Sequence, residues 1–135
     1  NTRNLMDIKF ELKPYAEENL DDVLAAISED PEWDFIICSA SKRDNYAERL
    51  KNSITYVCYS QLGFCGYIRA IVDNGMALYI SELFVKPECR NQKIGQQLIE
   101  KVKESNSSLT VYALSDEDRY YEKKGYKKIG SVFEI

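Results

Sequence analysis

The spacing of apolar residues along the chain separates segments with helical periodicity from segments with strand periodicity. Apolar residues three or four positions apart predict helices at residues 15–28, 44–51, 93–104 and 116–124. Alternating or continuous apolar runs between turn residues predict strands at residues 7–12, 54–59, 64–72, 77–85, 108–114 and 127–134. The apolar run at residues 35–40 is too short to assign to either class.

Turn residues connect the predicted strands in a definite order. The triplets Gln-Leu-Gly at 61–63 and Asp-Asn-Gly at 73–75 are typical of hairpins, so the three strands between residues 54 and 85 form an antiparallel meander. A strand–helix–strand crossover follows the meander. This order predicts an α/β (α+β) fold, in which a mixed sheet carries helices on both faces.

The segment from Val85 to Ile99 joins a strand to an amphipathic helix and is the best candidate for chemistry. Pro87 ends the strand because it has no N–H to donate. A polar turn follows, with Arg90 at its start and Gly95 inside the first helical turn, and it leaves several backbone N–H groups unpaired. Such a helix end suits phosphate and indicates a phosphorylated cofactor, although capping by water or side chains is the alternative. The glycine patterns of nucleotide P-loops and dinucleotide-binding turns are missing.

Two motifs in the second half of the chain resemble those of the GNAT superfamily of N-acyltransferases. Arg90-x-x-Lys93-x-Gly95 is similar to the family's acyl-CoA loop, Gln/Arg-x-x-Gly-x-Gly/Ala, and follows a strand that ends Leu-Phe-Val-x-Pro. Residues 120–126, Tyr-Tyr-Glu-Lys-Lys-Gly-Tyr, are similar to the family's Phe-Tyr-Glu-Lys-x-Gly-Phe. The resemblance extends over about residues 6–135. It implies one GNAT-like domain over residues 1–135, with a mixed, mostly antiparallel central sheet and helices on both faces.

The resemblance also implies acetyl-CoA as the co-substrate. In the family, the strands here at 77–85 and 108–114 splay apart, and the pantetheine arm fills the gap by pairing with backbone groups near Phe84 and Val85. The phosphates would lie against the loop and the first helical turn, formed by Arg90, Asn91, Gln92, Lys93, Ile94, Gly95 and Gln96. Lys93 departs from the family by replacing a glycine that lets the backbone approach the pyrophosphate closely. Its ammonium group could instead reach a phosphate as a point charge.

The implied reaction is direct attack by a primary amine of a small molecule or peptide on the acetyl thioester. The ammonium group, with a pKa near 10.4, must lose a proton, and the departing thiolate must be stabilised. The chain contains no histidine, so carboxylate, tyrosine, thiol, lysine or water must move these protons. Tyr121 matches the family tyrosine that faces the thioester sulfur and is the candidate acid, with packing as its alternative role. Tyr120 is expected to point elsewhere and pack in the core.

Glu82 is the candidate base because it is a carboxylate in a largely apolar strand, close to the expected thioester. A solvent-facing or salt-bridged glutamate is the alternative. Tyr79 and Ser81 would line the opposite face of that strand and could order a water that accepts the proton instead. Trp33, Tyr46 and Tyr56 either line the acceptor pocket or simply pack.

Charge and cysteine content limit the classes of ligand and partner that the chain is expected to bind. The net charge of −4, with no basic stripe, argues against nucleic acid and mildly favours a cationic small molecule. Four cysteines without a Cys-x-x-Cys pair make a metal site unexpected, and we expect free buried thiols, with Cys58 and Cys65 close enough to be neighbours across a hairpin. Without an apolar span or signal-peptide core we expect a cytoplasmic protein with no membrane partner.

Two alternatives to an acetyltransferase stay open at this point. A non-catalytic acyl-CoA-binding module of the same fold is favoured by Lys93 and opposed by Tyr121. A structural α/β interaction domain is opposed by the paired motifs. The acceptor, the acyl-chain preference and the oligomeric state, including a homodimer, are not determined by the sequence. Residues 1–5 are expected to be a frayed end or a vector-derived remnant.

Overall fold

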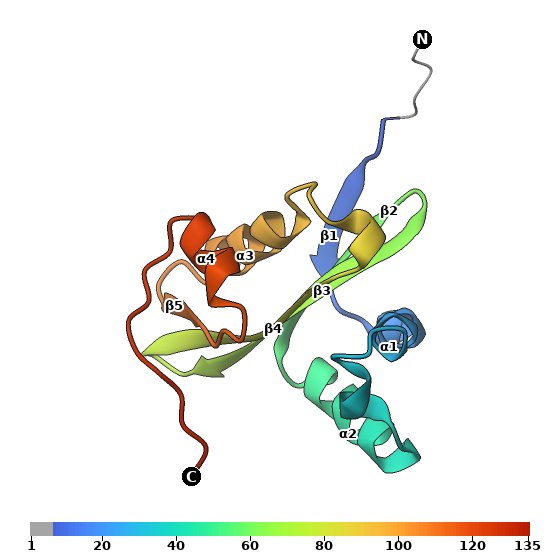
Figure 1. Ribbon diagram of the computed structural model, residues 1–135, viewed down its shortest axis with the longest axis horizontal. Coiled ribbons are helices and arrows are strands. Elements are labelled where there is room, and N and C mark those ends of the chain that lie inside the picture. The colour runs from blue at the N-terminus through green and yellow to red at the C-terminus, as the bar shows by residue number, and fades with distance from the viewer. Residues whose placement is uncertain (1–6) are drawn as a thin grey trace.

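The protein is built around one five-stranded mixed sheet with the strand order β1-β2-β3-β4-β5 (Figure 1). The computed structural model describes residues 7–135, so the expected frayed end at residues 1–5 lies outside the described part. The strands are β1 (Phe10–Pro14), β2 (Ile54–Ser60), β3 (Gly63–Asp73), β4 (Ala77–Val85) and β5 (Thr110–Ala113). The first four pair antiparallel and β5 pairs parallel to β4, which confirms the predicted fold class.

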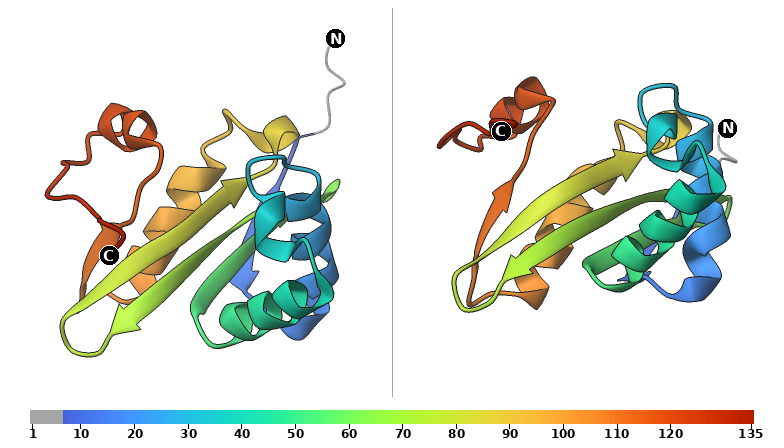
Figure 2. Two further views of the ribbon diagram at one scale, coloured as in Figure 1. Left: turned by 60° about the horizontal axis from the view of Figure 1, so that its bottom comes forward. Right: turned by 90° about the horizontal axis from the view of Figure 1, so that it is seen from below.

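Helices cover both faces of the sheet, as Figure 2 shows. One face carries α1 (Leu20–Ser28), α2 (Ala40–Lys51) and the short 3₁₀ turns Glu17–Asn19 and Asp34–Ile37. The other face carries α3 (Ile94–Ser105) and α4 (Asp118–Lys123), and the 3₁₀ turn Pro87–Cys89 precedes α3. The connection from β4 through α3 to β5 is the predicted crossover, and it places the start of α3 beside the end of β4.

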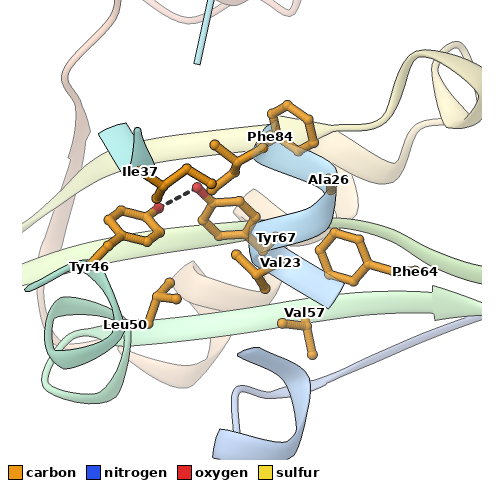
Figure 3. Close-up of a cluster of buried hydrophobic side chains, with 10 residues drawn as sticks. Val23, Ala26, Ile37, Tyr46, Leu50, Val57, Phe64, Tyr67 and Phe84 are labelled. Atoms are coloured by element: carbon orange, nitrogen blue, oxygen red, sulfur yellow. Dashed lines mark hydrogen bonds between the residues drawn. The ribbon is translucent and has the colours of Figure 1, made fainter. Parts of the chain in front are cut away.

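Two buried clusters hold these layers together. The first lies under α1 and α2, and Figure 3 shows it around Tyr67 and Phe84. The second lies under α3 and contains the helix's buried stripe of Ile94, Leu98, Ile99 and Val102. This stripe was predicted from helical spacing and is confirmed.

Most predicted elements are present, with shifted ends. The strand at 77–85 has the predicted bounds, whereas α2 begins four residues before the predicted 44–51. Its first turn is polar and therefore invisible to a search for apolar spacing. Ser39 caps this turn by accepting a hydrogen bond from the Lys42 N–H at 3.2 Å. The unassigned run 35–40 supplies a 3₁₀ turn and this cap.

The strand predicted at 127–134 is wrong. The segment forms no strand, and Ile129, Val132 and Phe133 are 67%, 76% and 79% exposed. A strand requires a pairing partner, and an apolar composition alone does not provide one. Gly125, at a φ of 87°, ends α4 just before this segment, and the Tyr126 N–H bonds back to the Tyr121 carbonyl, which completes a glycine-ended helix cap.

The four cysteines are free, as expected. Cys58 and Cys65 are buried as expected, Cys89 is partly buried, and Cys38 is exposed, so the expected burial is wrong for Cys38. Burial and the neighbouring Cys65 thiol raise the pKa of Cys58 to about 12. This thiol therefore stays protonated and behaves as a small apolar side chain.

Candidate active site

The strands β4 and β5 pair over only half of the length of β4. Their register runs from Ala77 opposite Thr110 to Ile80 opposite Ala113, and the Leu114 N–H donates to the Ile80 carbonyl at 2.9 Å. Beyond this point β4 continues to Val85 while β5 turns away, as the right-hand view in Figure 2 shows. The second half of β4 therefore has a sheet partner on the β3 side only.

The backbone of β4 offers hydrogen-bonding groups along this open edge. The Lys86 N–H bonds to the Cys65 carbonyl at 2.8 Å, so the alternation of an antiparallel ladder turns the N–H and C=O of Leu83 and Val85 away from β3. Phe84 directs its own backbone groups towards Tyr67 of β3, and its ring is buried in the first cluster. Leu83 and Val85 thus form the open edge.

The loop between β4 and α3 contains two non-glycine residues with left-handed backbone. Asn91 has a φ of 64° and Lys93 a φ of 65°. Lys93 stands where the family pattern has glycine. Glycine adopts this left-handed conformation without strain, whereas a residue with a side chain pays about 1–2 kcal/mol. Asparagine tolerates the left-handed region better than most residues. The loop keeps its shape here at a cost in strain.

The N-terminus of α3 presents uncapped donors. Lys93 is the N-cap residue, and no side chain in the described part of the chain caps this end. Helical pairing begins with the Gln97 N–H, which donates to the Lys93 carbonyl at 3.0 Å. The N–H groups of Ile94, Gly95 and Gln96 therefore have no intrahelical acceptor, which makes the first turn a favourable site for an anion.

Arg90 connects the loop to the end of β4. Its Nε donates to the Val85 carbonyl at 2.9 Å, and its Nη2 lies 3.9 Å from an Asp30 carboxylate oxygen. The side chain is about half exposed, so donors remain free to reach a ligand. Asn91, Gln92, Lys93 and Gln96 are also exposed, whereas Ile94 and Gly95 are buried.

Tyr120 occupies a position that the sequence analysis missed. A Cβ added to Gly95 would overlap the Tyr120 hydroxyl, and it would lie 3.7 Å from Cδ2 of Leu83. The Tyr120 hydroxyl therefore lies against the first turn of α3, close to the open edge of β4, and Gly95 provides the space for it. The glycine inside the helix was the only signal in the sequence for this contact.

Tyr121 packs between two other tyrosines. Its ring lies edge-on to Tyr120, with centroids 5.1 Å apart, and 6.3 Å from the ring of Tyr126. Burial, followed by the neighbouring Tyr120 and Asp116, raises the pKa of Tyr121 to about 12. The phenol therefore stays protonated at neutral pH and has a proton to donate.

Glu82 lies in a hydrogen-bonded cluster on the opposite face of the sheet from Tyr121. Arg69 binds it with two nitrogens, Nε to Oε1 at 3.0 Å and Nη2 to Oε2 at 2.7 Å. The Tyr46 hydroxyl donates to Oε1 as well, and the Tyr46 and Tyr67 hydroxyls are hydrogen-bonded to each other (Figure 3). The Arg69 and Glu82 side chains are only 7% and 14% exposed. Glu82 is therefore salt-bridged, and its role as the base stays a prediction.

Ser81 lies on the same side of the strand as Glu82, so its predicted place on the opposite face is wrong. The ladder pairs Arg69 with Glu82 but Ala70 with Ile80, which leaves Ser81 as the extra residue of a β-bulge. The bulge resets the alternation, and the Ser81 hydroxyl accepts from Arg69 Nη2 at 3.1 Å. No glycine marks this bulge in the sequence.

Tyr79 and the aromatic residues proposed for the acceptor pocket lie in different parts of the structure. Tyr79 stacks on Tyr112 of β5, with ring centroids 5.6 Å apart. Trp33 packs edge-on against Phe84, and Tyr56 packs against the α3 cluster. Of the three aromatics named for the acceptor pocket, Tyr46 lines a cavity beside Glu82.

A surface cavity of about 340 Å³, wide open to solvent, lies between α2 and the sheet, directly beside Glu82. Its walls combine aromatic, apolar and basic side chains, namely Phe35, Ile36, Lys42, Asn45, Tyr46, Arg49, Arg69 and Glu82. Its volume is within the range of small-molecule sites. Glu82 stands next to Leu83, so the cavity and the open edge of β4 meet at neighbouring residues.

Comparison with known proteins decides the family. Residues 16–135 match the family model for the acetyltransferase (GNAT) domain. The chain belongs to the GNAT acetyltransferase family. The acyltransferase class and the resemblance read from the two motifs are thereby confirmed.

Solved structures agree with this GNAT assignment at the level of the fold. An aminoglycoside acetyltransferase from an uncultured soil metagenomic sample has a TM-score of 0.72 at 18% identity, over 94% of this chain and 97% of that one. Aminoglycoside N-acetyltransferase AAC(6′)-Iy, in complex with CoA, has a TM-score of 0.75 at 12% identity over 96% and 95%. PaiA N-acetyltransferase from Thermoplasma acidophilum, also with CoA, gives 0.65 at 17% over 88% and 90%. No curated protein sequence matches this GNAT chain.

Two further observations concern the described part of this GNAT domain. None of the helices in residues 7–135 has the length and apolar character needed to cross a membrane. Within the same residues, histidine, cysteine and acidic side chains form no group of three that could hold a metal ion.

Proposed function

We propose that this GNAT protein is an N-acetyltransferase that moves an acetyl group from acetyl-CoA to a primary amine of a small molecule or peptide by direct attack. One observation carries the proposal. The open edge of β4 leads directly to the uncapped N-terminus of α3, so a single extended ligand can pair with a strand edge and place phosphates on a helix end.

The binding role follows from the groups available along this path. The backbone groups of Leu83 and the N–H of Val85 would pair with the amide groups of the pantetheine arm, as a neighbouring strand does, while the Val85 carbonyl already accepts from Arg90 Nε. The N–H groups of Ile94, Gly95 and Gln96 would receive the pyrophosphate, and the exposed donors of Arg90 would add a charge-assisted contact. CoA in the complexes of AAC(6′)-Iy and PaiA supports this choice of ligand.

The acceptor would approach from the cavity beside Glu82. Arg69 and Tyr46 fix the Glu82 carboxylate, and a carboxylate has about four acceptor sites, of which Oε2 uses one for Arg69. The free site on Oε2 would accept the amine's proton directly or through one water. Tyr121 would give its proton to the thiolate as the thioester carbon–sulfur bond breaks, since burial keeps its phenol protonated.

Thermal unfolding with acetyl-CoA, CoA, NAD and ATP tests the cofactor. Acetyl-CoA at 100 times its dissociation constant should stabilise the protein by about 2.7 kcal/mol, while NAD and ATP should give no comparable rise in Tm. Arg90→Ala should weaken CoA binding by about 1.5–3 kcal/mol. Lys103→Ala, which removes a positive charge from the far end of α3, is the matched control. Absence of any shift with millimolar acetyl-CoA would refute the cofactor assignment.

Turnover separates the enzyme from a non-catalytic acyl-CoA-binding module of the same fold. Acetylated product from an amine panel should be followed by mass spectrometry rather than by a thiol reagent, because Cys38 is an exposed free thiol and would react. Binding of acetyl-CoA with no product from any amine would favour the non-catalytic module.

A further inference from the structure

The cavity beside Glu82 carries an excess of positive charge, opposite in sign to the whole chain. Its charged walls are Lys42, Arg49, Arg69 and Glu82. Glu82 and Arg69 neutralise each other in their ion pair of 2.7 Å. Lys42 and Arg49 remain, and neither has a carboxylate within 4.0 Å among residues 7–135. The cavity is therefore formally +2, within a protein of net charge −4.

The basic residues belong to one side of α2. Lys42 lies four residues before Tyr46 and Arg49 three residues after it, and both line the cavity together with Asn45 and Tyr46. Lys42 and Arg49 therefore stand about one helical turn, roughly 5 Å along the axis, on either side of Tyr46. Tyr46 itself donates to Glu82. An amine held at Glu82 thus has a basic group within the length of a small molecule.

The two basic side chains differ in what already engages them. Lys42 Nζ donates to the Phe35 carbonyl at 3.3 Å, which leaves it further donors. Arg49 makes no side-chain hydrogen bond with any residue in the described range, so its whole guanidinium fork is available. A guanidinium suits a carboxylate or a phosphate through two parallel hydrogen bonds. Arg49 is therefore the stronger candidate for binding an anion.

We propose that the acceptor is an amine that also carries an anionic group, such as a carboxylate or phosphate, and that Arg49, assisted by Lys42, binds this group. The inference rests on the proposed function and specifies its acceptor. A polyamine or an aminoglycoside would bring several ammonium groups against two uncompensated cations. The cavity charge therefore opposes such acceptors, although aminoglycoside acetyltransferases share the fold.

Matched pairs of amines test this inference in the wild-type protein. The pairs are tyrosine and tyramine, lysine and cadaverine, and phosphoethanolamine and ethanolamine, within a panel of amino acids, dipeptides, polyamines and an aminoglycoside. The acid-bearing member should give at least tenfold higher kcat/KM in at least one pair. The first two pairs test a carboxylate and the third tests a phosphate. Equal or faster acetylation of the acid-free members would overturn the inference.

Variants locate the anion site. Arg49→Gln should raise KM for the acid-bearing amine about tenfold with kcat nearly unchanged, and should change KM for its acid-free partner less than twofold. Lys51→Gln is the matched control, because Lys51 lies on the same helix and pairs with Glu17 on the surface, away from the cavity. An equal effect of Arg49→Gln on both members of a pair would overturn the assignment of Arg49.

The failures of the two proposals are distinguishable. If acetyl-CoA binds and acid-free amines are the acetylated ones, only the acceptor inference is overturned. If acetyl-CoA binds and no acid-bearing amine is acetylated or bound in its presence, the acceptor inference is again overturned while the cofactor assignment stands. If acetyl-CoA itself does not bind, the proposed function fails, and the acceptor inference fails with it.

Discussion

The two halves of β4 are both largely apolar, but they have different surroundings. From Ala77 to Ile80 the strand pairs with β3 on one side and β5 on the other. From Ser81 to Val85 it pairs with β3 alone, and the bulge, the Glu82 ion pair and the open edge all fall there. Both halves are apolar enough to read as one strand. The comparison teaches that two features create the site: β5 turns away from β4, and Ser81 adds one residue to β4 as a bulge.

The ion pair that anchors the open half should give the largest effect. Arg69→Met leaves the Glu82 carboxylate buried without its cation, and we expect a loss of about 3–5 kcal/mol in the free energy of unfolding. Arg69→Met combined with Glu82→Leu removes both charges and should recover much of this loss. Urea unfolding measures both variants. A loss below 1 kcal/mol for Arg69→Met would show that solvent reaches the pair.

The proposed acid, Tyr121, should affect catalysis without affecting the fold. Tyr121→Phe should lower turnover about 100-fold or more while acetyl-CoA affinity and Tm stay near wild type, because only the hydroxyl is removed. Tyr120→Phe, on the neighbouring ring, is the comparison variant.

The pH dependence gives an independent check on Tyr121. An acid whose pKa is raised to about 12 stays protonated through pH 10, so wild-type kcat should show no alkaline decline below that pH. For stability, the same raised pKa favours the folded state below the unfolded value of about 10, and this contribution is lost as pH rises towards 12. For the Tyr121→Phe variant itself, a turnover equal to that of the wild type, measured where chemistry is rate-limiting, would show that Tyr121 is a packing residue.

The loop at the end of the open half should give the smallest effect. Lys93→Gly relieves a left-handed lysine at a φ of 65°, which should raise the free energy of unfolding by up to about 1 kcal/mol and leave CoA affinity unchanged or improved. Asn91→Gly is the control, since asparagine already tolerates a φ of 64°. Weaker CoA binding in Lys93→Gly would indicate that the ammonium group contacts a phosphate.

The sequence predicted what depends on local pattern. The meander, the α3 stripe and the bounds of β4 all follow from residues close in the chain. The bulge at Ser81, the Tyr120–Gly95 contact and the Arg69–Glu82 pair join residues on different elements, and no spacing rule encodes them. The segment 127–134 was wrongly predicted as a strand for a related reason. Strand formation depends on a pairing partner elsewhere in the chain, which composition does not reveal. The basic cavity could not be predicted from the net charge of the chain, which is negative.

The position of Trp33 has an optical consequence. It is the chain's one tryptophan, and its indole ring packs edge-on against Phe84, with centroids 5.1 Å apart, and lies 6.5 Å from Tyr67. Phe84 is flanked in sequence by the two residues of the open edge, and Tyr67 bonds to the tyrosine that contacts Glu82. Indole emission, excited at wavelengths that tyrosine does not absorb, therefore reports on one position, next to the strand that would hold one substrate and the cluster that would hold the other.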